Sequence, residues 1–364
     1  MSRETTDSNV RGGRIGESAP VGRREALWSL LFLLIVVASV WAVTSQVRGF
    51  SFEGFMDCVR EASVLWLALA VACMLLHVFF EGAAILQICK TFGYPRRAID
   101  GFAYASADIY FSAITPSATG GQPASAFFMM RDGIPGPVST VALLVNLIMY
   151  TLSIVFIGAF CFIVRPGIFT MFSPLARGMI LVGCAVQLGL ATLFLLLLRE
   201  HRLLHRICDA VLRLLERVHL LRKPQARRER LRQAIEEYRG HVRMMAGQKS
   251  ALAKAFLLNL MQRVSLIGVT MCTFRALGGA GARMLDAWAV QGFSVLGYNF
   301  VPIPGAVGVA DLMMLDGFGQ MMSEQGAAHL ELLSRTLSFY SCILICGATV
   351  LLKYLIARGR KGNR

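Results

Sequence analysis

Charged residues are scarce in this chain. They make up 16% of its 364 residues, whereas a soluble domain usually carries about 25%. Hydrophobic residues make up 55%, and the mean hydropathy is +0.58. This excludes a disordered chain, which needs low hydrophobicity, and a soluble nucleic-acid-binding domain, although the net charge is +15. The composition predicts an all-α protein that crosses a lipid bilayer several times.

Several chemical signatures are also missing from the sequence. The nine cysteines contain no CxxC pair, and no histidines cluster at metal-ligand spacing. We therefore expect no metal, no disulfide framework and no cofactor, and most cysteines are interpreted as small apolar core residues. No GxxxxGK[ST] loop is present either, so any transport is expected to be passive or driven by an ion gradient. We do not expect an enzyme.

Long apolar runs dominate what is present. Six of them can cross the ~30 Å hydrocarbon core as helices, and they cover residues 26–47, 63–88, 138–164, 178–198, 251–274 and 333–356. The first run is longer than the core of a signal peptide, which favours an uncleaved span. A cleaved signal is the alternative, because Ala38 and Ala42 are small.

Basic residues predict the orientation of these spans. Five Lys/Arg lie in the tail 1–25, fourteen lie in residues 199–250, and the tail 358–364 is basic as well. The loops that would face the other side contain few. Lys and Arg accumulate on the cytoplasmic side of membrane proteins, so both termini are predicted to be cytoplasmic.

Two further apolar stretches, 101–130 and 286–319, are interrupted by glycine and proline. The interruptions fall at 115–123 and 302–308. Unwound backbone at membrane depth must be buried in protein or face a watery cavity. The length of the segments favours two broken, re-entrant helical hairpins. Two short crossings in each stretch remain the alternative, because the distribution of charge fits both.

The order of the segments predicts an inverted repeat. The region 26–198 holds the first half, with its broken hairpin, and the first span of the second half. The region 251–357 holds the rest of the second half, with the other hairpin. Each half then reads span, span, broken hairpin, span, in opposite orientations. Broken helices at matching places of two halves indicate a transporter whose site lies near the middle of the bilayer.

Residues 199–250 predict a basic amphipathic helical hairpin in the cytoplasm. Its basic faces suit anionic lipid headgroups, which attract each cation by about 1 kcal/mol near the surface. A solvated connector is the alternative. The expected protein partners of the whole chain are a second copy of itself or a separate lipid-modifying enzyme. We expect no nucleic acid as a partner.

Ionisable residues inside apolar segments are costly and usually mark a functional site. The candidates are Glu81, Asp108, Arg263 and Asp311. Arg263 would bind a phosphate or carboxylate, because its planar fork matches such groups. Helix N-termini after each break would attract the same anion. The alternative is a buried pair of Arg263 with Glu81 or Asp311 that only holds helices together.

Other charged residues are expected to have simpler roles. His77 is interpreted as a packed core residue. Arg131, Asp132, Asp316 and Arg335 are expected near the membrane–water interface.

Two motifs resemble those of a known family. The first motif reads Thr115-Pro116-Ser117-Ala118-Thr119-Gly120-Gly121-Gln122-Pro123. It is similar to the Pro…Gly-Gly-Gln-Pro signature of the lysylphosphatidylglycerol synthase transmembrane region, the flippase-like half of bacterial multiple-peptide-resistance proteins. The second motif reads Pro302-Ile303-Pro304-Gly305-Ala306-Val307-Gly308-Val309-Ala310-Asp311. It resembles the Pro-x-Pro-Gly-x-x-Gly-x-x-Glu motif of the same family, with Asp in place of the final Glu.

The resemblance implies a bacterial plasma-membrane protein that moves an aminoacyl-phospholipid or a lipid-linked glycan between leaflets. It also implies a stand-alone member without the aminoacyl-transferase domain. The expected headgroup site comprises the four ionisable candidates together with Thr115, Ser117, Thr119, Gly120, Gly121, Gln122, Asn299, Pro302, Pro304, Gly305 and Gly308.

Two other functions remain open at this point. One is an accessory subunit that scaffolds a lipid-modifying enzyme through residues 199–250. The other is a transferase that uses a lipid-linked donor, with catalytic acids among Glu53, Asp57 and Glu61 in the loop before the second span.

Overall fold

A computed structural model describes residues 52–115, 119–199, 240, 244–245 and 247–362 of the chain. These residues contain helices and no strand. The α-helices are α2 (Phe52–Glu61), α3 (Val64–Thr91), α4 (Ala98–Ile114), α5 (Gly121–Arg131), α6 (Gly136–Val164), α7 (Pro166–Met171), α8 (Pro174–Arg199), α11 (Lys249–Ala276), α12 (Met284–Tyr298), α13 (Val309–Phe318), α14 (Glu324–Arg335) and α15 (Ser341–Gly362). Three short elements join them, namely the 3-10 turns η2 (Gly281–Arg283) and η3 (Pro304–Ala306) and the π-helical turn η4 (Thr336–Tyr340).

Five helical segments of this part of the chain are long and apolar enough to cross a membrane. They are Val64–Thr91, Gly136–Val164, Pro174–Phe194, Lys249–Ala276 and Glu324–Ile356. They agree with the last five of the six predicted spans to within a few residues, except at the start of the last one. The chain is therefore an all-α, multi-pass membrane protein. The span predicted at 26–47 and most of the hairpin predicted at 199–250 lie outside the described residues.

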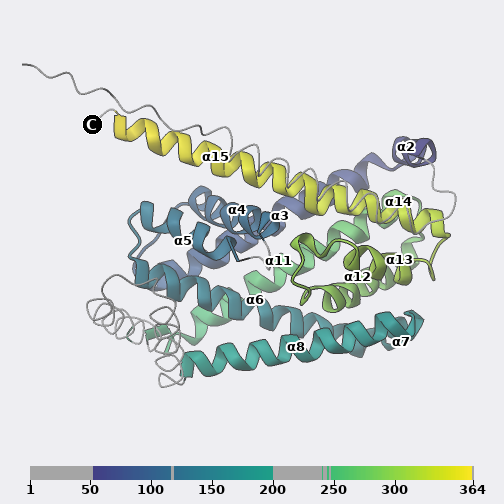
Figure 1. Cartoon of the computed structure of the whole chain (residues 1–364), viewed down its shortest axis with the longest axis horizontal. Helices are drawn as coiled ribbons and strands as arrows, with labels where there is room; N and C mark the ends of the chain where they lie inside the picture. The colour runs from purple at the N-terminus through teal and green to yellow at the C-terminus, as the bar shows by residue number, and fades with distance from the viewer. Residues whose placement is uncertain (1–51, 116–118, 200–239, 241–243, 246, 363–364) are drawn as a thin grey trace, which may run out of the picture.

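The predicted stretch 286–319 and the predicted span 333–356 leave residues 320–332 as a loop between them, and this was wrong. Helix α14 begins at Glu324, where the Ser323 side chain accepts a hydrogen bond from the Gly326 amide and caps the helix. Three charged residues and a histidine lower the hydropathy of this helix, but its apolar face is buried. It continues through η4 into α15, and the three elements form the long rod at the top of Figure 1.

Helices α3 and α11 form the central contact of the molecule. They run antiparallel, because the Ser63 amide just before α3 donates to the Ala276 carbonyl at the end of α11 over 3.0 Å. Equally far along each helix, His77 Nδ1 lies 3.3 Å from the Gln262 carbonyl. The two helices thus stay in register from one end to their midpoints.

Two pairs of interrupted helices flank this contact. Helices α4 and α5 pack on each other, as do α12 and α13. With a rise of about 1.5 Å per residue, even the 17-residue α4 is only ~26 Å long, which is less than the hydrocarbon core. Figure 1 shows α4 and α5 in the left half of the bundle and α12 and α13 in the right half.

Candidate functional site

A carboxylate and an amide join α3 to α11 in the centre of the bundle. Gln262 Nε2 on α11 donates to Glu81 Oε2 on α3 over 2.9 Å, and both side chains are buried. His77 lies one turn before Glu81 and contacts the Gln262 backbone, in agreement with the packed core role predicted for it. The Glu81 carboxylate is in electrostatic range of both Asp108 and Arg263.

The first helix pair adds a second carboxylate. Gln122 Nε2 on α5 donates to Asp108 Oδ2 on α4 over 2.6 Å, and the Ser112 hydroxyl donates to Oδ1 over 3.2 Å. Gly121 is required here, because a Cβ atom at this position would lie 2.1 Å from Asp108 Oδ1. The Gly-Gly-Gln motif therefore lets α5 approach α4 closely enough for Gln122 to bind this carboxylate.

Arg263 is the least satisfied of the buried charges. Its guanidinium carbon lies 3.9 Å from the centre of the Tyr150 ring, a cation–π contact. Only 7% of the residue is exposed, yet its Nε atom has no hydrogen-bond partner in the part of the chain that the structure describes. The Tyr150 hydroxyl donates to Asn299 Oδ1 over 3.3 Å, which extends the cluster to the second break.

The alternative pairing of Arg263 with Glu81 or Asp311 is not observed. No ion pair within 4.0 Å joins Arg263 to any described residue. We call Glu81, Asp108, Tyr150, Gln262 and Arg263 the central cluster. It combines a guanidinium that lacks a hydrogen-bonded anion with two carboxylates that are held by amides.

A second buried charge cluster lies beside the second break. Arg335 Nε is 2.8 Å from Asp311 Oδ1 and 3.7 Å from Glu331 Oε1, and its terminal nitrogens donate to the Gly305 carbonyl. Arg335 is 8% exposed and Asp311 is fully buried. Arg335, predicted near the membrane–water interface, is thus enclosed by the protein, and Asp311, predicted as a partner for a headgroup amine, is bound by this arginine.

The two breaks have different local structures. In the first, the Thr115 hydroxyl donates to the Phe111 carbonyl and accepts from the Gly120 amide, which closes the end of α4 onto the start of α5. Thr119 is exposed, whereas Ser117 lies outside the described residues.

In the second break, Gly305 and Gly308 have φ angles of 62° and 82°, a region that L-residues rarely adopt. Pro302 is exposed, and Pro304 opens the turn η3. The Gly308 amide donates to Asp311 Oδ2 over 2.8 Å. The N-terminus of α13, expected to attract an anion, is therefore already capped by a carboxylate of its own helix.

Some central residues escaped the sequence analysis. Tyr150 lies in the predicted span 138–164, and no sequence pattern there indicates that it contacts a charged residue. Glu331 was assigned to a loop, although its spacing of four residues from Arg335 is typical of a helical ion pair. Tyr298, at the end of α12, lies in electrostatic range of both Arg263 and Arg335, and so connects the two clusters.

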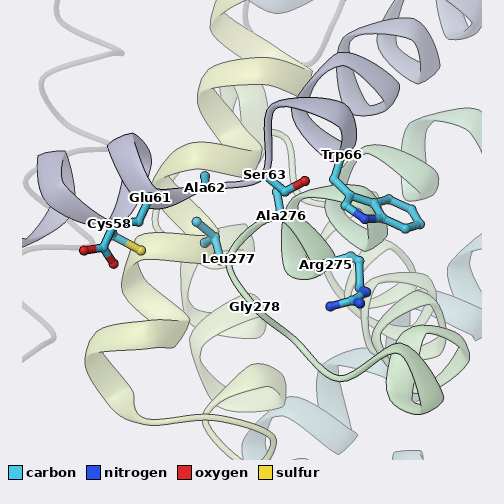
Figure 2. A pocket seen from close by; sticks show the side chains of 9 residues that line it. All are labelled: Cys58, Glu61, Ala62, Ser63, Trp66, Arg275, Ala276, Leu277 and Gly278. Atoms are coloured by element: carbon cyan, nitrogen blue, oxygen red, sulfur yellow. The ribbon is translucent and has the colours of Figure 1, made fainter.

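A cavity of about 390 Å³ lies at one end of the α3–α11 pair, well separated from the central cluster along these helices. Figure 2 shows Glu61 on one wall and Arg275 beside Trp66 on the other, with Ser63 between them. The Arg275 guanidinium carbon lies 5.9 Å from the centre of the Trp66 ring. A tryptophan and an arginine at the end of a span are typical of the lipid headgroup region.

Among the described residues, no group of three or more His, Cys, Asp or Glu side chains converges as metal ligands would. The acids of the short helix α2 lie at the surface: Asp57 forms an exposed pair with Arg60 at 3.2 Å.

Comparison with known proteins agrees with the membrane architecture. No curated protein matches the sequence. The family described as "Lysylphosphatidylglycerol synthase TM region" matches residues 27–346, which include both broken helix pairs and both charge clusters. The chain therefore belongs to the family of the lysylphosphatidylglycerol synthase transmembrane region.

Proposed function

We propose that this protein moves a phospholipid, or a lipid-linked molecule with a phosphate in its headgroup, between the leaflets of a bacterial plasma membrane. The observation that carries the proposal is Arg263, a buried guanidinium between two broken helix pairs whose Nε has no acceptor among the described residues. A buried charge without a hydrogen-bonded partner is costly. This cost is offset if the phosphate of a transported lipid binds Arg263 during each transport cycle.

The central cluster offers charged partners that replace the water molecules around a lipid headgroup. The fork of Arg263 suits the two free oxygens of a phosphodiester. Glu81 and Asp108 lie in electrostatic range of each other, and Glu81 also in range of Arg263, so an amine on the same headgroup finds carboxylates close to its phosphate. Acyl chains are apolar and can remain in the surrounding lipid. On this proposal the protein does no covalent chemistry.

The helix contacts support an inverted repeat. Helix α3 packs on α4 as α11 packs on α12, and α4 packs on α15 as α12 packs on α6. Likewise, α5 packs on α6 as α13 packs on α14. The equivalent helices α3 and α11 meet in antiparallel orientation, as a two-fold axis in the membrane plane requires. The two broken pairs then enter from opposite sides, with both termini in the cytoplasm.

Leaflet exchange of fluorescent lipids in proteoliposomes tests the proposal. We expect wild-type protein to accelerate the exchange of at least one anionic or aminoacylated phospholipid. Arg263→Gln should abolish the acceleration, because the amide cannot offer the charged fork, and Arg263→Lys should restore it in part. Arg60→Gln is the matched control, since Arg60 is exposed and pairs with exposed Asp57. Exchange equal to that of empty liposomes for every lipid tried would refute the proposal.

A further inference from the structure

An ionic contact closes the base of the first helix pair. Lys353 Nζ on α15 lies 2.6 Å from Asp100 Oδ1 and 2.7 Å from Asp132 Oδ2. Asp100 is in the first turn of α4 and Asp132 directly follows α5, so one lysine ties both ends of the pair to α15. The Tyr104 hydroxyl also donates to Asp132 over 2.7 Å. We call Lys353, Asp100 and Asp132 the first clamp.

The second helix pair has a matching contact. Arg165, directly after α6, lies 2.9 Å from Asp286 in the first turn of α12. Asp316, near the end of α13, accepts a hydrogen bond from the Ser173 amide before α8 over 2.8 Å. Both ends of this pair are thus tied to the α6–α8 connection as well. We call Arg165 and Asp286 the second clamp.

The two clamps are related crosswise. In each, a cation at the C-terminal part of a spanning helix binds an aspartate in the first turn of a broken pair. Helix α6 follows the first pair and holds the second, whereas α15 follows the second pair and holds the first. In Figure 1 the first pair and the free end of α15 lie at the left, and α7, which follows Arg165, lies at the right. The clamps are therefore at opposite ends of the bundle.

We propose that the two clamps are alternating gates, each of which must break before its end of the central cluster opens to water. This inference rests on the proposed function and adds the moving parts to it. Both clamps are formed in this structure, and Glu81, Asp108 and Arg263 are each at most 7% exposed. The structure therefore corresponds to a closed state between the two open ones.

The clamps differ in strength. The three side chains of the first clamp are 20–26% exposed, whereas Arg165 of the second is 43% exposed. Exposed ion pairs are screened and contribute less than partly buried ones. Among the described residues, Arg165 has only one carboxylate partner, whereas Lys353 has two. The end of the molecule that carries Arg165 therefore opens more readily.

Native cysteines lie beneath both clamps and can report on their opening. Cys89 is fully buried in the same apolar cluster as Tyr104, whose hydroxyl is bonded to the first clamp. Cys161 is 1% exposed and lies one turn before Arg165, whose amide donates to its carbonyl. Each thiol becomes accessible only if the helices above it separate.

The test measures alkylation of both cysteines by a small maleimide in full-length protein, followed by mass spectrometry of the two peptides. Lys353→Met should accelerate alkylation of Cys89 at least tenfold and leave Cys161 unchanged. Arg165→Met should do the reverse. Lys353→Arg, which keeps the charge, should behave as wild type.

Equal acceleration of both cysteines in either variant would show general loosening and overturn the proposal, as would no acceleration in both. A charge exchange, Arg165→Asp with Asp286→Arg, should restore slow alkylation of Cys161, and failure to do so would also count against the second gate. Alkylation needs no lipid transport. Selective opening without leaflet exchange would therefore retain the gates and refute only the proposed function.

Discussion

Buried charges in this protein fall into two kinds at the scale of single residues. Arg335 is satisfied by Asp311, Glu331 and the Gly305 carbonyl, and so has the environment of a structural residue. Arg263 has an aromatic face and no hydrogen-bonded acceptor among the described residues. The contrast separates a residue that holds the second break in place from one that, on the proposed function, would bind the headgroup phosphate.

Removing Asp311 is expected to destabilise the protein. Asp311→Ala leaves the Arg335 charge buried, and breaking a buried ion pair costs about 3–5 kcal/mol. The lower part of that range applies, because Glu331 remains nearby. Thermal unfolding in detergent should show a clearly reduced Tm. Asp57→Ala, at an exposed pair, is the control, and an equal loss in both variants would contradict the structural role.

The thiol in the cavity of Figure 2 gives a pH-dependent prediction. Burial, and then the neighbouring Glu61 carboxylate, raise the pKa of Cys58 above its ordinary value. Less reactive thiolate is therefore present at neutral pH, and alkylation should accelerate as the pH rises. Glu61→Gln should lower this pKa and speed alkylation at neutral pH, with no difference at a pH above both values. An unchanged rate at neutral pH would place Glu61 too far from the thiol to act on it.

At the scale of helices, backbone contacts decide where side chains are tolerated. Gly183 on α8 lies against α12, and a Cβ atom there would be 1.8 Å from the Leu296 carbonyl oxygen. Gly189 lies six residues later on the same helix, and a Cβ atom there would have no described residue within 4 Å. Glycine thus has a packing role at one of these positions only.

Gly183→Ala is expected to lower stability by about 1–3 kcal/mol, as overpacking of a close contact usually does. Gly189→Ala should be neutral or slightly stabilising, since alanine is the better helix former. Detergent-solubilised variants compared by thermal unfolding would check this. A loss of stability in Gly189→Ala as large as in Gly183→Ala would contradict the α8–α12 contact as the cause, because helix propensity alone favours alanine at both sites.

Hydropathy and helix breakers predicted most elements to within a few residues. The break at 115–123 separates α4 from α5, and the break at 302–308 separates α12 from α13. Helix α14 was missed, because its polar residues outweigh its apolar face in any average over the segment. The site was predicted less completely. Glu81, Asp108 and Arg263 stand out in apolar runs, but Tyr150 and the burial of Arg335 depend on which helix lies opposite, and no local pattern encodes that.

At the scale of the whole molecule, the charge pattern and the order of the segments predict an inverted repeat, which stays a prediction. The pairing of α3 with α11 could not be predicted, because each helix alone is an apolar span with one polar stretch. That Gln262 donates a hydrogen bond to Glu81 is seen only once the two helices are placed side by side in antiparallel orientation.

Residues 200–239 distinguish a translocase from a scaffold. We expect that a Gly–Ser linker of equal length in place of these residues leaves leaflet exchange by purified protein unchanged, because the central cluster and both clamps lie elsewhere. If the segment also recruits a lipid-modifying enzyme, the same variant should fail in cells while it transports in liposomes. Loss of exchange in purified protein would instead make the segment part of the transport unit.

The antiparallel contact of α3 with α11 has a consequence for the composition of the central cluster. One helix supplies the carboxylate of Glu81, and the other supplies the amide of Gln262 and the guanidinium of Arg263. A slip of one helical turn along this pair would shift the two helices by about 5.4 Å and part the amide from the carboxylate. The alignment of this single pair of helices therefore decides which polar groups share the middle of the bundle.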